Sequence, residues 1–410
     1  MQLSDINLVD PDVFVQGVPH EQFTLLRKEA PVFWHEDALG GFWALTKHED
    51  VVHANRDAKT FSSYARSALY NVEDEESLNQ VRLMMLNLDP PDHTKLRKIV
   101  NRGFTPRRIK ELQQSLVDRS RDIVDNIAET GACDFVTEVA CELPLQAIAD
   151  LVGIPQEDRH KVFDWSNRLV GAADDEFAET AGEAQGAAIE LFMYAQDLAN
   201  ERRKNPRDDI VTDLLNAEVD GETLDDMEFN SFFMLLAVAG NETTRNAISH
   251  SMLALMQHPD QRQLLLDDPA LIDSAIEEFL RWATPVMHFK RTAMRDVEMR
   301  GQTIKEGDRV MMWYSSANRD EEVFEDPFRF DLKRDPNLHT LHSAFGGGGP
   351  HFCLGANLAR AEMKVIFQEL LGRIPDMELA GEPARLRSNF INGLKHLPVS
   401  FTPVGKSSNA

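Results

Sequence analysis

The most unusual segment of the chain reads Phe345-Gly346-Gly347-Gly348-Gly349-Pro350-His351-Phe352-Cys353-Leu354-Gly355. Four consecutive glycines disfavour both helix and strand, and they let a backbone pass very close to a flat or bulky group. Cys353 lies just ahead of residues 356–362, whose composition is that of a good helix start. A sulfur near the amino end of a helix is exposed to the helix dipole and to free backbone N–H groups, which favour the thiolate. The segment therefore predicts a cysteine that acts as a metal ligand or as a nucleophile.

A lone cysteine is more often a buried, inert side chain, and we keep that interpretation for Cys133 and Cys141, which have no such setting. A nucleophilic Cys353 would need a histidine base, for which His351 is the candidate. A zinc site would need further Cys or His residues at ligand spacing, and the sequence offers none. Haem iron needs one strong protein ligand and leaves its opposite face open, so this option remains.

Composition limits the classes of function that this chain of 410 residues can have. Its 43 basic and 68 acidic residues give a net charge of −25, which argues against whole-surface binding to nucleic acid or to anionic membranes. Only 3 cysteines are present, which is too few for a disulfide framework and indicates a reducing compartment. Residues 1–10 do not resemble a signal peptide, and the longest apolar run, 232–239, is far below the roughly 18 residues that span a bilayer. We expect a cytoplasmic, soluble protein.

Hydrophobic periodicity predicts a mainly helical chain. Apolar residues at three- and four-residue spacing predict helices over 105–127, 143–151, 183–205 and 224–258. Thr223 and Asp226 resemble a capping box at the start of the last of these. Short apolar runs predict a hairpin about Gly40-Gly41 and further strands, at 32–34, 42–46, 289–293, 297–299 and 309–314. No repeat or linker divides the chain, so we expect a single domain over 1–410 with a loose tail at 405–410.

The cysteine segment resembles the haem-binding signature of the cytochrome P450 superfamily in its soluble bacterial form, Phe-Gly-x-Gly-x-His/Arg-x-Cys-x-Gly. Phe345 lies eight residues before Cys353 instead of the usual seven, while His351, Cys353 and Gly355 keep their mutual spacing. By motif the resemblance extends from Asp89 to Gly393. It implies a mainly α fold with small β-sheets, a triangular prism of helices around haem b, with Cys353 as the axial thiolate of the iron. Phe345, Gly346 and Gly355 would contact the haem.

Two further motifs match the same family. Glu278-x-x-Arg281 places an acid and a base on one helix face, which alone usually means a solvated ion pair. The family has this motif followed by a segment like residues 324–330, and here that segment is followed by Arg334. The resemblance implies that Glu278, Arg281 and Arg334 form a buried charge network that holds the cysteine loop.

The long helix carries Ala239-Gly240-Asn241-Glu242-Thr243-Thr244, and a glycine and two β-branched residues inside an apolar helix indicate a local opening. A tolerated imperfection of packing is the plainer alternative. The resemblance implies that Ala239 and Gly240 lie over the haem at a groove for dioxygen. It also implies that Thr243 hydrogen-bonds the oxygen and that Glu242 relays protons.

Haem carries two propionates, so cations must converge on it. His93 and Arg97 lie four residues apart on one predicted helix face, and the resemblance adds Arg291 and His351 to this set. Each of them alone would more often be a surface residue.

A basic run without acids also stands out in this acidic chain, Lys95, Arg97, Lys98, Arg102, Arg107, Arg108 and Lys110. It is either a self-solvating helix face or a docking surface for an acidic ferredoxin that carries electrons from NAD(P)H through a reductase.

The substrate pocket should be apolar surface over the open haem face, for which the candidates are Met84, Met85, Leu86, Leu235, Val238, Val286, Met287, Phe289, Phe390 and Ile391. The strings at 239–246 and 388–394 resemble those of bacterial relatives that oxidise steroid side chains and methyl-branched lipids. We therefore expect a haem-thiolate monooxygenase that hydroxylates an unactivated C–H bond of such a substrate. The alternatives are a terpenoid hydroxylase of the same mechanism, a peroxide-driven peroxygenase, a non-catalytic haem-binding protein, and a zinc or cysteine hydrolase.

Overall fold

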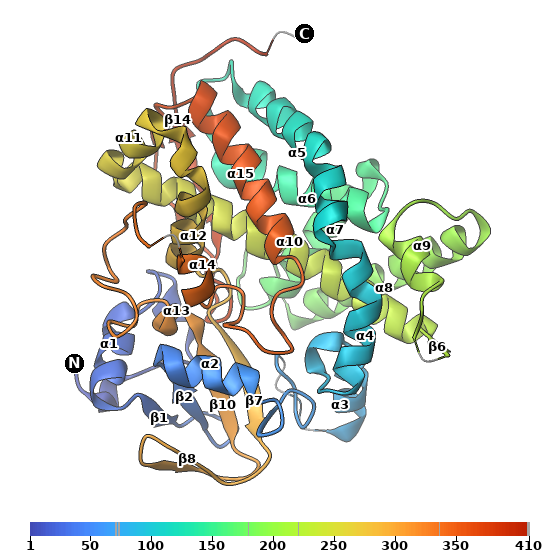
Figure 1. Cartoon of the computed structure of the whole chain (residues 1–410), viewed down its shortest axis with the longest axis vertical. Helices are drawn as coiled ribbons and strands as arrows, with labels where there is room; N and C mark the ends of the chain where they lie inside the picture. The colour runs from blue at the N-terminus through green and yellow to red at the C-terminus, as the bar shows by residue number, and fades with distance from the viewer. Residues whose placement is uncertain (70–71, 73, 179, 220, 336, 408–410) are drawn as a thin grey trace.

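The computed structural model describes residues 1–69, 72, 74–178, 180–219, 221–335 and 337–407. Figure 1 shows a mainly helical molecule in which the longest helix, α10 (Asp226–Gln257), crosses the centre behind α5 (Pro106–Ile127) and α15 (Ala356–Arg373). A mixed sheet and the N-terminal helices lie together at the opposite end from the C-terminus. The mainly α class with small β-sheets is confirmed.

The other helices surround α10 or cover the sheet. They are α1 His20–Glu29, α2 His48–Arg56, α3 Glu75–Val81, α4 Asp92–Val100, α6 Glu142–Val152, α7 Arg159–Val170, α8 Ala181–Lys204, α9 Ile210–Leu215, α11 Pro259–Asp267, α12 Ile272–Ala283, α13 Tyr314–Ala317 and α14 Leu338–Leu341. Short 3-10 turns connect several of them, such as η3 (Met85–Asn87).

The largest sheet has the strand order β1-β2-β10-β7-β3, from Val32–His35, Phe42–Leu45, Arg309–Trp313, His288–Ala293 and Phe61–Ser62. The β2/β10 pair is parallel and the other neighbours are antiparallel, so β10 joins the N-terminal hairpin to the C-terminal half of the chain. The smaller strands are β4 Ala132–Asp134, β5 Glu218–Val219, β6 Glu222–Thr223, β8 Val297–Met299, β9 Gln302–Ile304, β11 Glu378–Leu379, β12 Ala384–Arg385, β13 Leu394–His396 and β14 Pro398–Ser400.

The four predicted helices and the predicted hairpin are confirmed, with boundaries shifted by up to a few residues. The predicted cap of α10 is wrong, because Asp225 and Glu228 form the capping box in place of Thr223 and Asp226. Strand β9 is absent from the strands predicted from the sequence. It pairs with β8, and the turn between the two strands is only Arg300 and Gly301, both at positive φ.

The main hydrophobic core is continuous from α5 and α6 through α10 to α12 and α15. Phe232, Phe233, Ile248 and Met252 show that α10 is buried on several faces. An apolar helix surrounded by other helices has no solvated face to supply an amphipathic pattern. Its central place makes α10 one wall of an internal cavity.

The C-terminal segment is hydrogen-bonded to the helices as far as Ser407, beyond the point at which the sequence predicts a loose tail. The Ser407 N–H donates to Asp125 in α5 at 2.8 Å, and Arg373 donates to the Gly405 carbonyl at 3.1 Å. The predicted loose tail at 405–410 is therefore held up to Ser407, and residues 408–410 lie outside the described residues.

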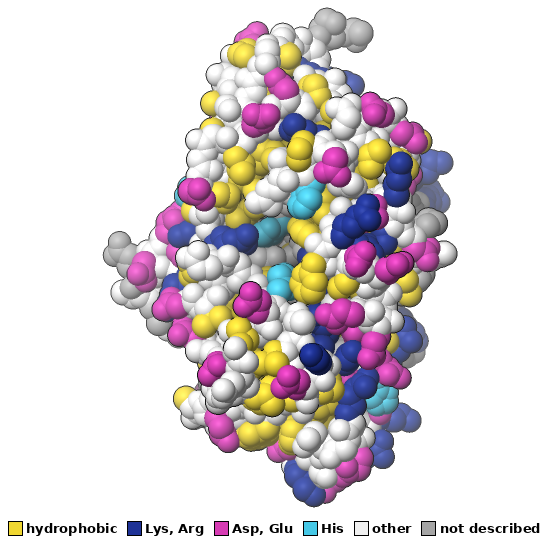
Figure 2. Space-filling view, turned by 90° about the vertical axis from the view of Figure 1, so that its left-hand side faces the viewer, with side chains coloured by type: hydrophobic (Ala, Val, Ile, Leu, Met, Phe, Trp, Pro, Cys, Tyr) yellow, Lys and Arg dark blue, Asp and Glu magenta, His cyan; other side chains and the backbone are white. Residues whose placement is uncertain are grey.

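Within the described chain, no helix is both long and apolar enough to cross a membrane. Acidic, basic and hydrophobic side chains are interspersed over the face shown in Figure 2.

Candidate active site

A cavity with about 1480 Å³ of empty space, part of it open to solvent, lies between α4, α10, α15, β7 and the cysteine loop. Most of the residues proposed from the sequence line it, namely Met85, Leu86, His93, Arg97, Leu235, Ala239, Gly240, Thr243, Val286, Phe289, Arg291, Phe345, Gly346, His351, Cys353 and Gly355. These residues come from segments up to about 270 positions apart, and the fold brings them to one place.

Cys353 faces this cavity from a loop that ends at the start of α15. The loop is closed by the Cys353 N–H, which donates to the Phe345 carbonyl at 3.0 Å. Burial raises the pKa of the Cys353 thiol, although the backbone N–H groups of Gly355 and Ala356 and the charge of Arg97 act in the opposite direction. The helix start and Arg97 thus favour the thiolate, as predicted from the sequence, and they act against the effect of burial on the thiol.

Three of the four consecutive glycines, Gly347, Gly348 and Gly349, pack on α2 rather than on the cavity. Gly346 lines the cavity, whereas a Cβ added to Gly349 would lie 2.2 Å from the Asn55 carbonyl oxygen at the end of α2. Gly349 also has φ of +79°, a left-handed conformation that other residues adopt at a cost. The close approach predicted from the glycines is thus largely an approach to α2.

Four basic side chains, those of His93, Arg97, Arg291 and His351, line the same cavity. The rings of His93 and His351 lie 4.2 Å apart, and both ring nitrogens of His93 are buried without a hydrogen-bond partner. Burial, aided by Arg97 and Arg291, lowers the pKa of His93 to about 4. Among the described residues, no carboxylate forms an ion pair with Arg97 or Arg291, and Arg291 is only 3% exposed. Buried cations of this kind fit a ligand that brings its own carboxylates, as the two propionates of haem would.

Helix α10 forms the wall that carries Ala239, Gly240 and Thr243, and it remains α-helical throughout. The Thr243 hydroxyl donates to the Ala239 carbonyl at 2.8 Å, so its remaining hydrogen-bonding capacity is that of an acceptor. A Cβ on Gly240 would lie 2.9 Å from Ile148 Cδ1 of α6. This glycine is therefore explained by close helix packing and not by an interruption of the helix.

Glu242, unlike Thr243, does not line the cavity. It is 1% exposed and forms an ion pair with Arg245 one turn later on α10, and Arg245 also donates to Asn167 of α7 at 2.7 Å. Burial raises the pKa of Glu242, and Arg245 opposes this effect. The structure thus separates the predicted acid–alcohol pair, with the hydroxyl in the cavity and the carboxylate behind it.

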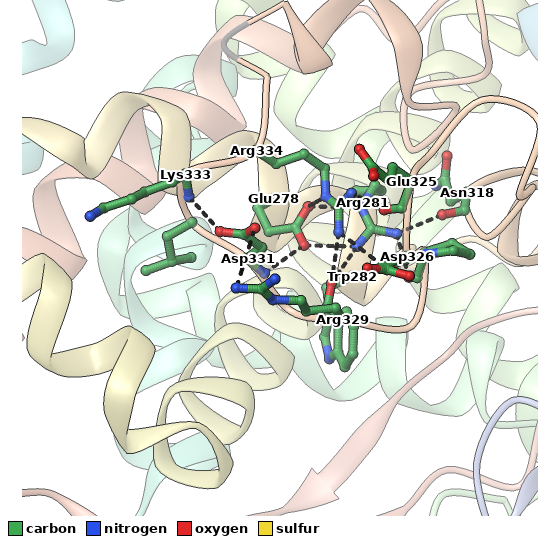
Figure 3. Close-up of polar contacts among 12 residues, drawn as sticks. Glu278, Arg281, Trp282, Asn318, Glu325, Asp326, Arg329, Asp331, Lys333 and Arg334 are labelled. Atoms are coloured by element: carbon green, nitrogen blue, oxygen red, sulfur yellow. Dashed lines mark hydrogen bonds and ion pairs between the residues drawn. The ribbon is translucent and has the colours of Figure 1, made fainter.

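The Glu278-x-x-Arg281 motif forms a buried network (Figure 3). Both side chains are 0% exposed, and the Arg281 guanidinium donates to both carboxylate oxygens of Glu278 at 2.7 Å. Arg334 approaches the same carboxylate at 3.3 Å, and Arg281 also donates to the carbonyls of Asn318 and Pro327 at 2.8 and 2.9 Å. The Arg281 guanidinium binds the Glu278 carboxylate with two parallel hydrogen bonds and uses further N–H groups on backbone carbonyls. The network therefore ties α12 to the irregular segment 318–334.

A second carboxylate network lies next to the first and was not foreseen. Glu277 accepts hydrogen bonds from His342 at 2.8 Å and from Arg360 of α15 at 2.6 and 2.9 Å. The Arg360 guanidinium lies 4.6 Å from the centre of the Phe345 ring. Although burial acts against ionisation, Arg360 and His342 lower the pKa of Glu277 to about 2. This network holds the first residue of the cysteine loop against α15.

Half of the proposed substrate residues line the cavity and half do not. Met84, Val238, Met287, Phe390 and Ile391 lie outside it, for example because Met287 packs with Phe14 and Trp313 in a separate core cluster. The cavity is completed by residues that the sequence did not single out, chiefly Phe104, Ile148, Phe232, Leu236, Thr244, Ala247, Leu280, Tyr314 and Glu362. Most are ordinary core residues by pattern.

Three comparisons relate this chain to known proteins. Residues 133–374 match the family model described as cytochrome P450. The chain is 48% identical to a steroid C26-monooxygenase of Rhodococcus jostii, over 96% of this chain and 84% of the relative. It is 44% identical to a methyl-branched lipid omega-hydroxylase of Mycobacterium bovis, over 98% of this chain and 95% of the relative.

Solved structures agree with these sequence matches. A Mycobacterium marinum cytochrome P450 in complex with pseudoionone superposes with a TM-score of 0.90 at 41% identity, covering 97% of this chain and 98% of that one. A Bacillus megaterium relative in complex with testosterone gives a TM-score of 0.83 at 33% identity, covering 93% and 97%. With its thiol, its buried cations and its apolar walls in one cavity, the chain belongs to the cytochrome P450 family of haem-thiolate monooxygenases.

Proposed function

We propose that this monooxygenase hydroxylates an unactivated C–H bond of a steroid side chain or of another branched lipid. The observation that carries the proposal is the apolar wall on the Thr243 side of the cavity, which includes Met85, Leu235, Val286 and Phe289. Hydrocarbon and aromatic side chains recognise shape and offer no hydrogen bonds that a polar substrate would need. The two hydroxylases with which this chain shares 44% and 48% of its residues support the same substrate class.

In this proposal each part of the cavity has one task. Cys353 ligates the iron, and His93, Arg97, Arg291 and His351 hold the propionates. Bound haem supplies the activation of dioxygen, which the thiolate assists by donating electron density. Leu235 and Phe289 exclude water and position the hydrocarbon, and Thr243 accepts or passes a proton at its hydroxyl oxygen.

Ligand binding and product analysis test the substrate class. Steroids with intact side chains and branched fatty acids should displace water from the iron and shift the Soret band, and turnover should place a hydroxyl on the chain. Phe289→Ala should change the affinity or the position of hydroxylation, because its ring lines the cavity. Phe390→Ala is the matched control, since its ring packs 5.6 Å from that of Phe289 but lies outside the cavity. Tight binding and turnover of small polar compounds alone would exclude the proposal.

The ligand role of Cys353 has its own test. The reduced protein with carbon monoxide should absorb at the long wavelength that is diagnostic of thiolate coordination. Cys353→His should retain haem at best and lose this band, while Cys133→Ser should keep it, because Cys133 lies away from the cavity. An unchanged spectrum of Cys353→His would show that another residue ligates the iron.

Electron delivery by an acidic ferredoxin is proposed for the surface of α4 and the start of α5. His93 and His351 connect α4 to the cysteine loop, and Phe352 beside Cys353 is 38% exposed. Not every residue of the basic run is an exposed cation without a partner. Arg97 faces the cavity, and Arg107 and Arg108 pair with Glu111. The side chain of Arg102 lies outside the described part of the structure. The exposed cations of the run are then Lys95, Lys98, Lys110 and Arg107. The side chain of Arg107 is 90% exposed although it pairs with Glu111, and Lys95 lies 3.9 Å from Asp92.

Replacement of these lysines tests the docking surface. Lys98→Glu with Lys110→Glu should slow reduction by ferredoxin at low salt, and the difference should shrink at about 1 M salt, where the Debye length is about 3 Å. Arg203→Glu with Lys204→Glu at the end of α8 is the control with the same change of charge. Equal effects of both pairs would indicate net charge and not a docking surface.

The terpenoid alternative stays open because the relative at 41% identity was solved with pseudoionone, an unsaturated isoprenoid ketone. It predicts that acyclic isoprenoids shift the Soret band more strongly than steroids do. The same binding experiment therefore separates the two substrate classes.

A further inference from the structure

Arg360 and Glu277 form a charge pair next to the cysteine loop, and neither side chain lines the cavity. The Arg360 guanidinium donates to both carboxylate oxygens of Glu277, at 2.6 and 2.9 Å, and so joins α15 to α12. A bidentate contact of this kind fixes the orientation of the guanidinium. The two side chains are 22% and 11% exposed, so solvent screens their charges only in part.

The third member of this cluster, His342, carries no charge. Its Nδ1 accepts the Ala344 N–H at 3.2 Å, so the ring proton lies on Nε2, which donates to Glu277 at 2.8 Å. Burial lowers the pKa of His342, although Glu277 acts against this effect. Glu277 itself is ionised, because its pKa of about 2 lies far below neutral pH. The cluster therefore holds one positive and one negative charge at pH 7.

Arg360 contacts the cysteine loop at two points. Its guanidinium lies 4.6 Å from the centre of the Phe345 ring, and the Phe345 carbonyl accepts the Cys353 N–H at 3.0 Å. Its Nη1 donates to the carbonyl of Ala356, the first residue of α15, at 3.3 Å. Burial raises the pKa of the Cys353 thiol, and Arg360 is one of the cations whose charge opposes this rise. The positive member of the pair thus acts on the sulfur.

We propose that Arg360 and Glu277 are positioning residues that set the reduction potential of the haem iron through its Cys353 ligand. Reduction transfers one electron from the redox partner to the iron and adds one negative charge to the iron and its thiolate. A positive charge nearby stabilises the reduced state and raises the potential, whereas a negative charge lowers it. Arg360 supplies the positive charge, and Glu277 orients it and offsets part of it. The proposal rests on the ligand role of Cys353, and it holds for whichever substrate is turned over.

A second charge pair between the same two helices provides a matched control. Asp273 lies one turn before Glu277 on α12, and Lys364 lies one turn after Arg360 on α15. The Lys364 ammonium lies 2.7 Å from the Asp273 carboxylate, but these side chains are 37% and 72% exposed. Water and salt therefore screen this pair more strongly than the pair beside the cysteine loop.

Spectroelectrochemical titration of the haem-loaded protein measures the potential without turnover. Arg360→Gln removes the positive charge and should lower the potential, whereas Glu277→Gln leaves the guanidinium unopposed and should raise it. Arg360→Lys keeps the charge and should stay closer to wild type than Arg360→Gln does. The double variant of Glu277→Gln with Arg360→Gln should return toward wild type, because both charges are then absent. Asp273→Asn and Lys364→Gln should shift the potential much less.

A purely structural role of the pair predicts a different pattern. Looser packing would admit water to the cysteine loop in either single variant, so both potentials would move in the same direction, in proportion to the stability lost in urea unfolding. Shifts of the same sign for Arg360→Gln and Glu277→Gln overturn the proposal. Shifts no larger than those of Asp273→Asn and Lys364→Gln overturn it as well.

The infrared C–O stretch of the reduced carbon monoxide complex is a second readout, because stronger electron donation by the thiolate lowers its frequency. Arg360→Gln should lower this frequency and Glu277→Gln should raise it. If Arg360→Gln does not bind haem, Glu277→Gln and Arg360→Lys decide the matter by their potentials and frequencies. A wild-type complex without the long-wavelength band would refute the ligand role of Cys353 and this proposal with it. A normal band with equal potentials in all variants would refute the role of the pair alone.

Discussion

The carboxylate of Glu242 and the guanidinium of Arg245 form an ion pair one turn apart on α10, with both side chains 2% exposed. Arg245 extends the contact to Asn167 of α7 at 2.7 Å. The pair therefore joins the central helix α10 to the neighbouring helix α7. A carboxylate that the sequence assigns to proton relay is also part of the tertiary structure.

Breaking this pair should be costly on either side. Arg245→Met leaves an unpaired buried carboxyl and Glu242→Gln leaves an unpaired buried cation, so each should lower the free energy of unfolding by about 3 kcal/mol or more. The double variant should regain much of the loss, because neither charge is then left alone. Urea unfolding of the four proteins measures the coupling between the two residues. If the Glu242 carboxyl also relays protons, turnover should stay low in the double variant although its stability recovers.

The Glu277 network should make the acid side of the stability profile steeper. The folded pKa of Glu277 is about 2 against 4.5 for an ordinary glutamate, so its contribution is complete above pH 4.5 and is lost as the pH falls toward 2. A difference of this size corresponds to about 3 kcal/mol. Urea midpoints measured between pH 6 and pH 3 should therefore fall less steeply for Glu277→Gln than for wild type. Parallel curves would show that the carboxylate is not held by Arg360 and His342 in solution.

The glycine run offers a paired test of backbone approach. Gly349→Ala places a Cβ 2.2 Å from the Asn55 carbonyl oxygen at φ of +79°, and should cost about 2 kcal/mol or more. Gly372→Ala in α15 meets nothing within 4 Å and should stabilise the helix by about 0.5 kcal/mol or more. Thermal unfolding of both variants measures the contrast. A tolerated Gly349→Ala would mean that the loop does not rest on α2.

Patterns with a local cause were predictable from the sequence. Four helices and the hairpin at Gly40-Gly41 follow from periodicity and turn residues, which depend on neighbours in the chain. The cysteine segment and the Glu278-x-x-Arg281 motif could be placed at the site because their spacing is unusual in combination. The same resemblance correctly placed Met85, Leu86 and Thr243 in the cavity.

Features with a tertiary cause were not predictable. Whether Met287 lines the cavity or packs on Phe14 depends on which face of β7 meets the N-terminal segment, which is distant in sequence. The partner of Glu277 comes from α15, eighty-three residues later, and no local spacing announces it. Glu242 was assigned to the cavity with Thr243, but adjacent residues on a helix point about 100° apart and one of them faces away.

The hydroxyl of Thr243 decides between oxygen activation and helix packing. It donates to the Ala239 carbonyl at 2.8 Å while its oxygen lines the cavity, so removal of the hydroxyl should disturb proton handling more than substrate binding. Thr243→Val keeps the shape and lacks the hydroxyl, and should consume NAD(P)H while releasing more hydrogen peroxide and less product. Thr243→Ser restores the hydroxyl without the methyl group and should recover most of the coupling. Product and peroxide per NAD(P)H, measured with the same substrate at equal Soret shift, separate the two roles. If Thr243→Val couples as well as wild type, then the hydroxyl serves only its contact with Ala239, and proton delivery must be assigned to another group that reaches the cavity.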